Sequence, residues 1–338
     1  MAYPATKRYN YLGQFGILIG FIGGGLIFGQ IIALIPLFLK TGGSLFGANS
    51  KEVMDKLFVP ENAGVLRLVQ FLSTFFLFFL PAFFYARICH KKPLTHLGYK
   101  ESVNMQQAGL AIVIMFVCLP LVGALTELTE KLPFSKATFE KFRLAEEEYN
   151  KQINIIGRMN NFGDYILSLF MLAILPALFE ETFFRGGIQN LLSRWIKMPI
   201  LAIIITSIVF SAVHGSYLGF LSRFVLGFVL GWMYHRTGNL WLSIIGHAFN
   251  NGFAITVLYV MKLKDPNMDL SKADPEFPIW TGAASIVVLY GLYILFEKVN
   301  KHQINQPGRE LVMQIENPKQ PSWLTQNSET THNTPNGI

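Results

Sequence analysis

Charged residues are scarce in this sequence. Lys, Arg, Asp and Glu make up 14% of its 338 residues, whereas soluble globular chains carry about 25%. Apolar residues make up 51%, and the charges that are present cluster between long apolar runs. This pattern is typical of a chain that crosses a membrane several times. The composition therefore argues against a soluble globular protein.

Cysteine is scarce as well, and Cys89 and Cys118 form neither a C-x-x-C pair nor a Cys/His zinc pattern. We expect two unpaired thiols, buried or at the membrane interface. The motif H-E-x-x-H is absent, which excludes a zincin site. The net charge is +7, and in a membrane chain such an excess sets topology and contacts anionic headgroups. We therefore expect membrane lipid as a partner and no nucleic acid.

Eight apolar stretches approach the length of about 20 residues that a transmembrane helix needs. They are Gln14–Leu39, Ala63–Ala86, Gln107–Thr126, Tyr165–Phe184, Met198–His214, Tyr217–Tyr234, Leu240–Val260 and Pro278–Phe296. We predict an all-α fold, a polytopic bundle of about eight transmembrane helices. Gly227 and Gly231, four apart in the sixth stretch, predict close helix packing.

Basic residues gather before the first stretch and after the second, fourth, sixth and eighth. This distribution predicts an even number of spans with both termini in the cytoplasm. Lys7 and Arg8 precede an apolar run too long for a signal peptide, so the first stretch is expected to be an anchor. The short loops and the Asn- and Thr-rich tail favour a multi-pass protein of a bacterial cytoplasmic membrane.

The chain divides into four expected segments. N-terminal transmembrane helices and an amphipathic surface helix occupy 1–163, and a helical core that carries the polar motifs occupies 164–262. A last transmembrane helix occupies 263–300. The segment 301–338 is rich in Asn, Gln, Thr and Pro, which predicts a disordered tail.

Ionisable residues stand out inside the fourth stretch, because each costs about 2.5–3.5 kcal/mol to place in a membrane. Glu181 and Arg185 are four apart in the favourable order, so we expect a structural ion pair between them. Glu180 is rotated by about 100° from Glu181 on a helix and has no obvious local partner. A carboxylate in such an apolar setting suits a general base.

Two histidines lie in the fifth and seventh stretches. His214 follows Phe210 by four residues, and His247 shares a helix face with Asn251. A histidine and an amide on one face can hold a water molecule or donate hydrogen bonds to an oxyanion.

The turn at Lys197 lies seventeen residues from both Glu180 and His214. A helical hairpin that turns there would place the two side chains at equal height, about 25 Å from the turn. Counting along straight helices does not bring His247 to that height, so a tilted or broken helix would be needed.

Taken in order, the three motifs E-E-x-x-x-R, F-x-x-x-H and H-x-x-x-N resemble the type II CAAX prenyl endopeptidase and bacteriocin-processing (CPBP, Abi) family. The resemblance covers about Tyr165–Val260. It implies an intramembrane endopeptidase whose substrate is a membrane-associated peptide or a lipidated protein, with a prenylated CAAX sequence as one candidate.

The resemblance also implies roles for these residues. Glu180 would activate the attacking water, and His214 would help to bind it. His247 and Asn251 would stabilise the tetrahedral oxyanion. The supporting residues would be Glu181 and Arg185.

The need for a metal stays open at this point. Glu180, His214 and His247 could supply three ligands to a divalent metal such as zinc, with water in the fourth position. A mechanism without a metal, in which the glutamate alone activates the water, is the alternative.

Two other functions fit a bundle with buried polar residues. The chain could be a non-enzymatic membrane scaffold or a bacteriocin self-immunity protein. It could also be a transporter that uses the buried glutamate and histidines as a proton relay. The transporter is less favoured, because the sequence shows neither an internal repeat nor interrupted helices.

Overall fold

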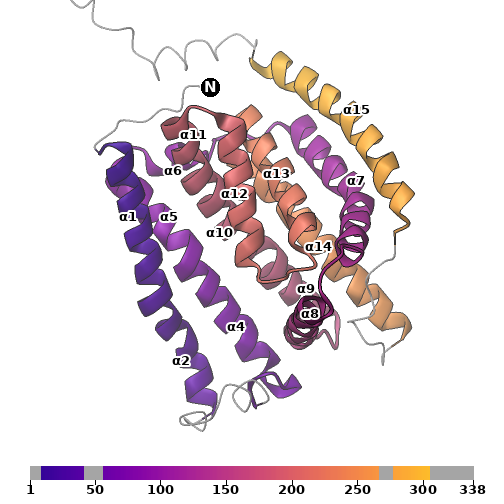
Figure 1. Ribbon diagram of the computed structural model, residues 1–338. Coiled ribbons are helices and arrows are strands. Elements are labelled where there is room, and N and C mark those ends of the chain that lie inside the picture. Colours follow the sequence, from indigo (N-terminus) through magenta and orange to yellow (C-terminus); the bar gives the residue numbers. More distant parts are fainter. Residues whose placement is uncertain (1–8, 42–55, 266–276, 305–338) are drawn as a thin grey trace, which may run out of the picture.

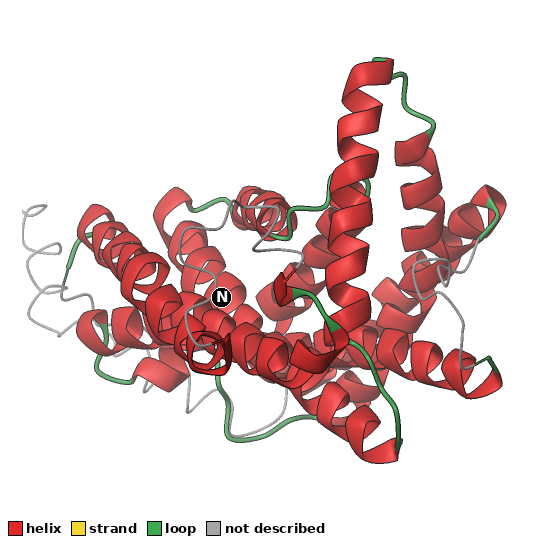
Figure 2. Ribbon diagram, turned by 90° about the horizontal axis from the view of Figure 1, so that it is seen from below, coloured by secondary structure: helices red, strands yellow, loops and turns green. Residues whose placement is uncertain are grey.

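The computed structural model describes residues 9–41, 56–265 and 277–304, and within these ranges every regular element is a helix (Figures 1 and 2). The predicted all-α fold is confirmed. Of the predicted tail 301–338, only the end of the last helix is described, and the remainder lies outside the described residues.

Among the described residues, six helical runs are long and apolar enough to cross a membrane, which makes the chain an integral membrane protein. They are formed by α1 and α2 (Tyr11–Gly24, Gln30–Thr41), α4 and α5 (Ala63–Thr74, Leu80–Cys89), α7 (Met105–Glu130), α9 to α11 (Phe162–Ser168, Leu175–Glu181, Asn190–Ile196), α14 (Leu240–Lys264) and α15 (Ile279–Ile304).

The predicted number of eight spans is not confirmed. The fifth predicted stretch forms α12 (Pro199–Val213), whose 15 residues make a helix of about 22 Å, shorter than a bilayer core. The sixth forms α13 (Phe220–Thr237), which carries Arg223, His235 and Arg236 and is not among the six apolar runs. Both helices pack in the bundle beside the longer ones.

Helices α10 to α14 occupy the middle of the bundle in Figure 1, with α1, α4 and α5 on one side and α7 and α15 on the other. α12 packs along α13, and α15 packs along α7. α14 is inclined relative to α12 in this view. The central helices are those that carry the sequence motifs.

Widened π-helical turns interrupt several spans. In the fourth span they cover Leu169–Ile174 and Thr182–Gln189, directly before and after α10. Pro176 lies in the first turn of α10 and cannot donate a backbone hydrogen bond. Such a residue favours a local break in the α-helical pattern, and π turns recur at functional sites. The two turns therefore set the direction in which α10 presents its side chains.

The predicted close packing at Gly227 and Gly231 is confirmed. A methyl group added at Gly227 would lie 3.2 Å from Phe210 Cδ1, and one added at Gly231 would lie 2.6 Å from Gln189 Oε1. The carbonyl oxygen of Gly227 accepts from Arg185 Nη2 (2.9 Å), and that of Gly231 accepts from Gln189 Nε2 (2.8 Å). α13 is thus joined to the fourth span by two polar contacts one helical turn apart.

A polar network fixes the end of α11 against α1 and α5. Arg194 Nε donates to Asn190 Oδ1 (2.8 Å), and its Nη2 donates to Tyr85 Oη (3.1 Å) and Gln14 Oε1 (3.2 Å). Cys89 lies nearby, and both cysteines of the chain are buried and unpaired, as predicted.

The amphipathic helix predicted between the third and fourth spans is α8 (Lys136–Ile156), and it buries no residue fully. Its last turn is held by Arg67, whose Nε donates to the Ile156 carbonyl oxygen (2.7 Å). Its middle contacts the loop after α12, where Ser216 donates to Glu146 Oε2 (2.7 Å) and Phe142 stacks on Tyr217 with centroids 4.5 Å apart.

Candidate active site

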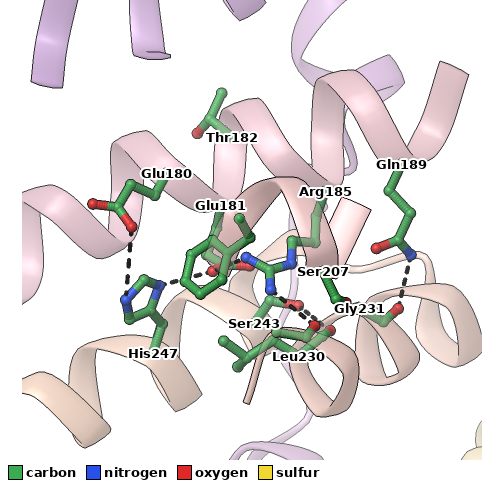
Figure 3. Close-up of polar contacts among 12 residues, drawn as sticks. Glu180, Glu181, Thr182, Arg185, Gln189, Ser207, Leu230, Gly231, Ser243 and His247 are labelled. Atoms are coloured by element: carbon green, nitrogen blue, oxygen red, sulfur yellow. Dashed lines mark hydrogen bonds and ion pairs between the residues drawn. The ribbon is translucent and has the colours of Figure 1, made fainter. Parts of the chain in front are cut away.

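Helix α10 places two adjacent glutamates in different surroundings. Glu181 is 0% exposed, and Glu180 is 8% exposed. Because neighbouring residues on a helix differ by about 100° in direction, the two carboxylates serve different partners. Figure 3 shows Glu181 directed towards Arg185 and Glu180 directed towards the ring of His247.

The predicted ion pair between Glu181 and Arg185 is present, with Arg185 Nη1 2.5 Å from Glu181 Oε1. Both side chains are fully buried. The guanidinium also lies 4.7 Å from the centroid of the Phe210 ring, a cation–π contact. The same Glu181 oxygen lies 2.8 Å from His247 Nδ1 (Figure 3). Glu181 therefore fixes a cation and a site histidine at once.

Hydrogen-bond partners determine which nitrogen of each histidine carries a proton. A carboxylate or carbonyl oxygen only accepts, so His247 Nδ1 donates to Glu181 and His214 Nδ1 donates to the Phe210 carbonyl oxygen at 2.7 Å. In either ring, when it is neutral, the unprotonated nitrogen is then Nε2. Both Nε2 atoms face Glu180.

These two nitrogens converge on one oxygen. Glu180 Oε2 lies 3.7 Å from His214 Nε2 and 4.0 Å from His247 Nε2. Both separations exceed hydrogen-bond length, and this oxygen has no hydrogen-bond partner among the described residues. A water molecule between the three atoms could donate to the carboxylate and to one imidazole. The carboxylate and the two imidazoles thus face one another across distances that a water molecule can bridge.

A tetrahedral metal ion fits these atoms less well. Ligand bonds of about 2.1 Å would place neighbouring ligand atoms about 3.4 Å apart, closer than the separations of 3.7 and 4.0 Å. Across the described ranges, no group of three acidic, His or Cys side chains is close enough to hold a metal ion. As placed, Glu180, His214 and His247 are therefore spaced more widely than three ligands of a tetrahedral zinc ion.

Asn251 lies one turn beyond His247 on α14. Its Oδ1 accepts from Asn250 Nδ2 (3.4 Å), and within the described ranges its side chain makes no hydrogen bond to Glu180 or either histidine. The structure thus brings three of the four predicted catalytic residues together and leaves Asn251 beside them.

The hairpin predicted from sequence counting is confirmed. Lys197 adopts a left-handed conformation (φ 59°) between α11 and α12, and Glu180 and His214 meet on the two sides of this turn. His247 reaches the same height on the inclined helix α14 (Figure 1).

Phe210 contacts both site histidines, which its spacing of four residues from His214 did not predict. Its ring lies between the two histidines, with centroids 4.7 Å from His214 and 5.7 Å from His247. The hydrogen bond from Arg185 to the Gly227 carbonyl oxygen was not predicted either. A pattern of glycines predicts close helix packing, but it does not identify the donor that a glycine carbonyl oxygen will bind.

Fold and site define a polytopic helical membrane protein with a carboxylate and two histidines converging inside the bundle. The family model described as type II CAAX prenyl endopeptidase Rce1-like matches residues 162–253. This segment contains all the predicted site residues, and the predicted resemblance is confirmed over it. The spans before residue 162 and the helix α15 lie outside the match.

One curated relative is a Bacillus subtilis (strain 168) protein described as "Uncharacterized protein YpbD". It is 28% identical over 110 residues, which are 31% of this chain and 51% of the relative. The match therefore spans about half the length of that relative. No solved structure matches the chain.

Proposed function

We propose that this protein is an intramembrane endopeptidase in which Glu180 activates a water molecule. The observation that carries the proposal is the convergence of His214 Nε2 and His247 Nε2 on Glu180 Oε2, at distances that leave space for water. The match to a CAAX prenyl endopeptidase family model over the same segment supports it.

In the first step, Glu180 accepts a proton from the water, and the water oxygen attacks the carbonyl carbon of the scissile peptide bond. His214 orients this water through Nε2, because its Nδ1 is committed to the Phe210 carbonyl oxygen. A tetrahedral oxyanion results. Glu180 then returns the proton to the leaving nitrogen as the C–N bond breaks, which yields a carboxylic acid and an amine; transfer of the acid proton to the amine gives the carboxylate and ammonium products.

The oxyanion needs hydrogen-bond donors on the other side of the carbonyl. A His247 ring protonated on both nitrogens donates Nδ1–H to Glu181 and Nε2–H to the oxyanion, and the Glu181 carboxylate balances its charge. Asn251 is assigned as a second donor, since its amide lies one turn away on the same helix. Arg185 supports this arrangement by holding Glu181 in place.

The substrate is proposed to be a membrane-associated peptide or lipidated protein whose scissile bond enters the bundle at the level of Glu180. A prenylated CAAX sequence is the first candidate, because of the family match. The catalytic core would be 164–262, within a bacterial cytoplasmic membrane and with both termini in the cytoplasm.

Cleavage of a prenylated CAAX reporter by the purified full-length protein tests the proposal. We expect Glu180→Gln to lower the rate by a factor of about 10²–10⁴, the usual contribution of a general base. Glu147→Gln is the matched control, because this carboxylate is exposed on α8 and pairs with Arg143. Its rate should equal that of the wild type.

Two further outcomes have defined meanings. A folded Glu180→Gln protein that cleaves at the wild-type rate would overturn the assignment of the base. A folded wild type that cleaves neither the prenylated reporter nor its unprenylated form would favour a binding scaffold. A chelator arm, with zinc added back, tests the metal separately.

A further inference from the structure

A second polar pocket lies near the C-terminal end of α14, remote from the site above. It has a volume of about 330 Å³ and is lined by Arg158, Met159, Asn160, Tyr259, Lys262 and Leu263. Lys262 follows His247 by fifteen residues on the same helix, a rise of about 22 Å. The pocket is therefore separate from the proposed catalytic centre.

Positive charge dominates the surroundings of this pocket. Arg158 donates from Nε to Asn160 Oδ1 (3.2 Å), and within the described residues neither its remaining guanidinium nitrogens nor Lys262 Nζ has a hydrogen-bond partner. Arg67, which lies against the same loop, donates from Nη2 to the Arg158 carbonyl oxygen and adds a third cation.

The carboxylate of Asp164 interacts electrostatically with both Lys262 and Arg67. Its Oδ2 already accepts the backbone N–H of Asn160 (2.9 Å). The described residues that line the pocket include two cations, Arg158 and Lys262, and no carboxylate, which leaves excess positive charge at a pocket with room for a ligand.

We propose that this pocket binds a phosphate group. Arg and Lys with unengaged N–H groups are the side chains that recognise phosphate oxygens, and Asn160 and Tyr259 add neutral donors at the rim. The neighbouring surface of α14 is apolar, since Val260 is 44% and Leu263 is 65% exposed. A cationic pocket beside an apolar surface suits an anionic phospholipid, whose phosphodiester would bind in the pocket and whose acyl chains would lie along α14. Free inorganic phosphate would bind through the same oxygen atoms.

Native mass spectrometry of the full-length protein in detergent tests the proposal with dioleoyl phosphatidylglycerol, dioleoyl phosphatidylcholine and inorganic phosphate as probes. We expect Arg158→Gln and Lys262→Gln each to weaken binding about tenfold, the loss of one charge-assisted hydrogen bond. Lys264→Gln is the matched control, because Lys264 ends the same helix and does not line the pocket. It should bind within about twofold of the wild type.

The probes distinguish the source of the phosphate. Retention of phosphatidylglycerol without retention of inorganic phosphate identifies a lipid headgroup, and retention of both identifies a site for the anion itself. Equal binding of each probe by the wild type, the Arg158→Gln/Lys262→Gln protein and the control would overturn the proposal. Melting temperatures of all variants confirm that they are folded.

Discussion

Glu181→Ala leaves the Arg185 guanidinium buried without its carboxylate. Both side chains are 0% exposed and are joined at 2.5 Å. Removal of one partner from a buried pair costs about 3–5 kcal/mol, because the other charge stays desolvated and uncompensated. The remaining bond of Arg185 to the Gly227 carbonyl oxygen offsets little of this charge. We expect a loss of stability in that range, measured by equilibrium unfolding in mixed micelles.

The Arg236–Glu297 ion pair provides the matched comparison. Its side chains are 38% and 13% exposed, so water reaches the pair and screens it, and truncation of one partner leaves the other charge better solvated than in a fully buried pair. Glu297→Ala should therefore destabilise the protein far less than Glu181→Ala. Comparable losses in the two variants would show that burial does not set the strength of the Glu181–Arg185 pair.

A double variant separates charge from packing. If the uncompensated charge causes the loss, adding Arg185→Met to Glu181→Ala should recover part of the stability, since hydrophobic side chains can replace a buried ion pair. Failure to recover any stability would refute the electrostatic reasoning. Catalysis should stay impaired in both proteins, because His247 has lost the acceptor that orients its ring.

Two other predictions concern packing and pH. Gly227→Ala should lower the free energy of unfolding by about 1–3 kcal/mol, because the added methyl group would press on Phe210. It should also slow reporter cleavage, since Phe210 contacts both site histidines. An unchanged melting temperature and cleavage rate would contradict this prediction. Burial, with a smaller effect of the nearby Arg194 charge, lowers the pKa of His90 from 6.5 to about 4. Because the unfolded chain then binds more protons than the folded one between these values, the melting temperature should be level above pH 6.5 and fall as the pH drops towards 4. His90→Phe should make that decline shallower, and an unaltered decline would assign it to other groups.

Counting residues predicted the part of the site that depends on one hairpin. Glu180 and His214 are equally far from Lys197, and both arms are helical, so the rise per residue alone sets their heights. The Glu181–Arg185 pair was predictable for the same reason, as a local spacing on one helix.

Other features depend on tertiary structure that a count does not contain. The height of His247 depends on the inclination of α14, and the acceptor for its Nδ1 is a residue of another helix. The π turn at Thr182–Gln189 begins six residues after Pro176 and contains Gly186 and Gly187, but these residues do not indicate from the sequence where the helix widens. The predicted number of eight spans is not confirmed, because among the described residues α12 is too short and α13 not apolar enough to count as spans by length and composition alone.

The π turn at Leu169–Ile174 holds more residues than an α-helical turn of the same height. Rewinding of this turn into an α-helix with the surplus residue retained would rotate everything beyond it by about 100°. Phe179 would then occupy the direction that Glu180 takes now. Deletion of one residue together with the rewinding would instead leave Glu180 where it is, so the surplus residue of this turn sets which side chain faces the two histidines.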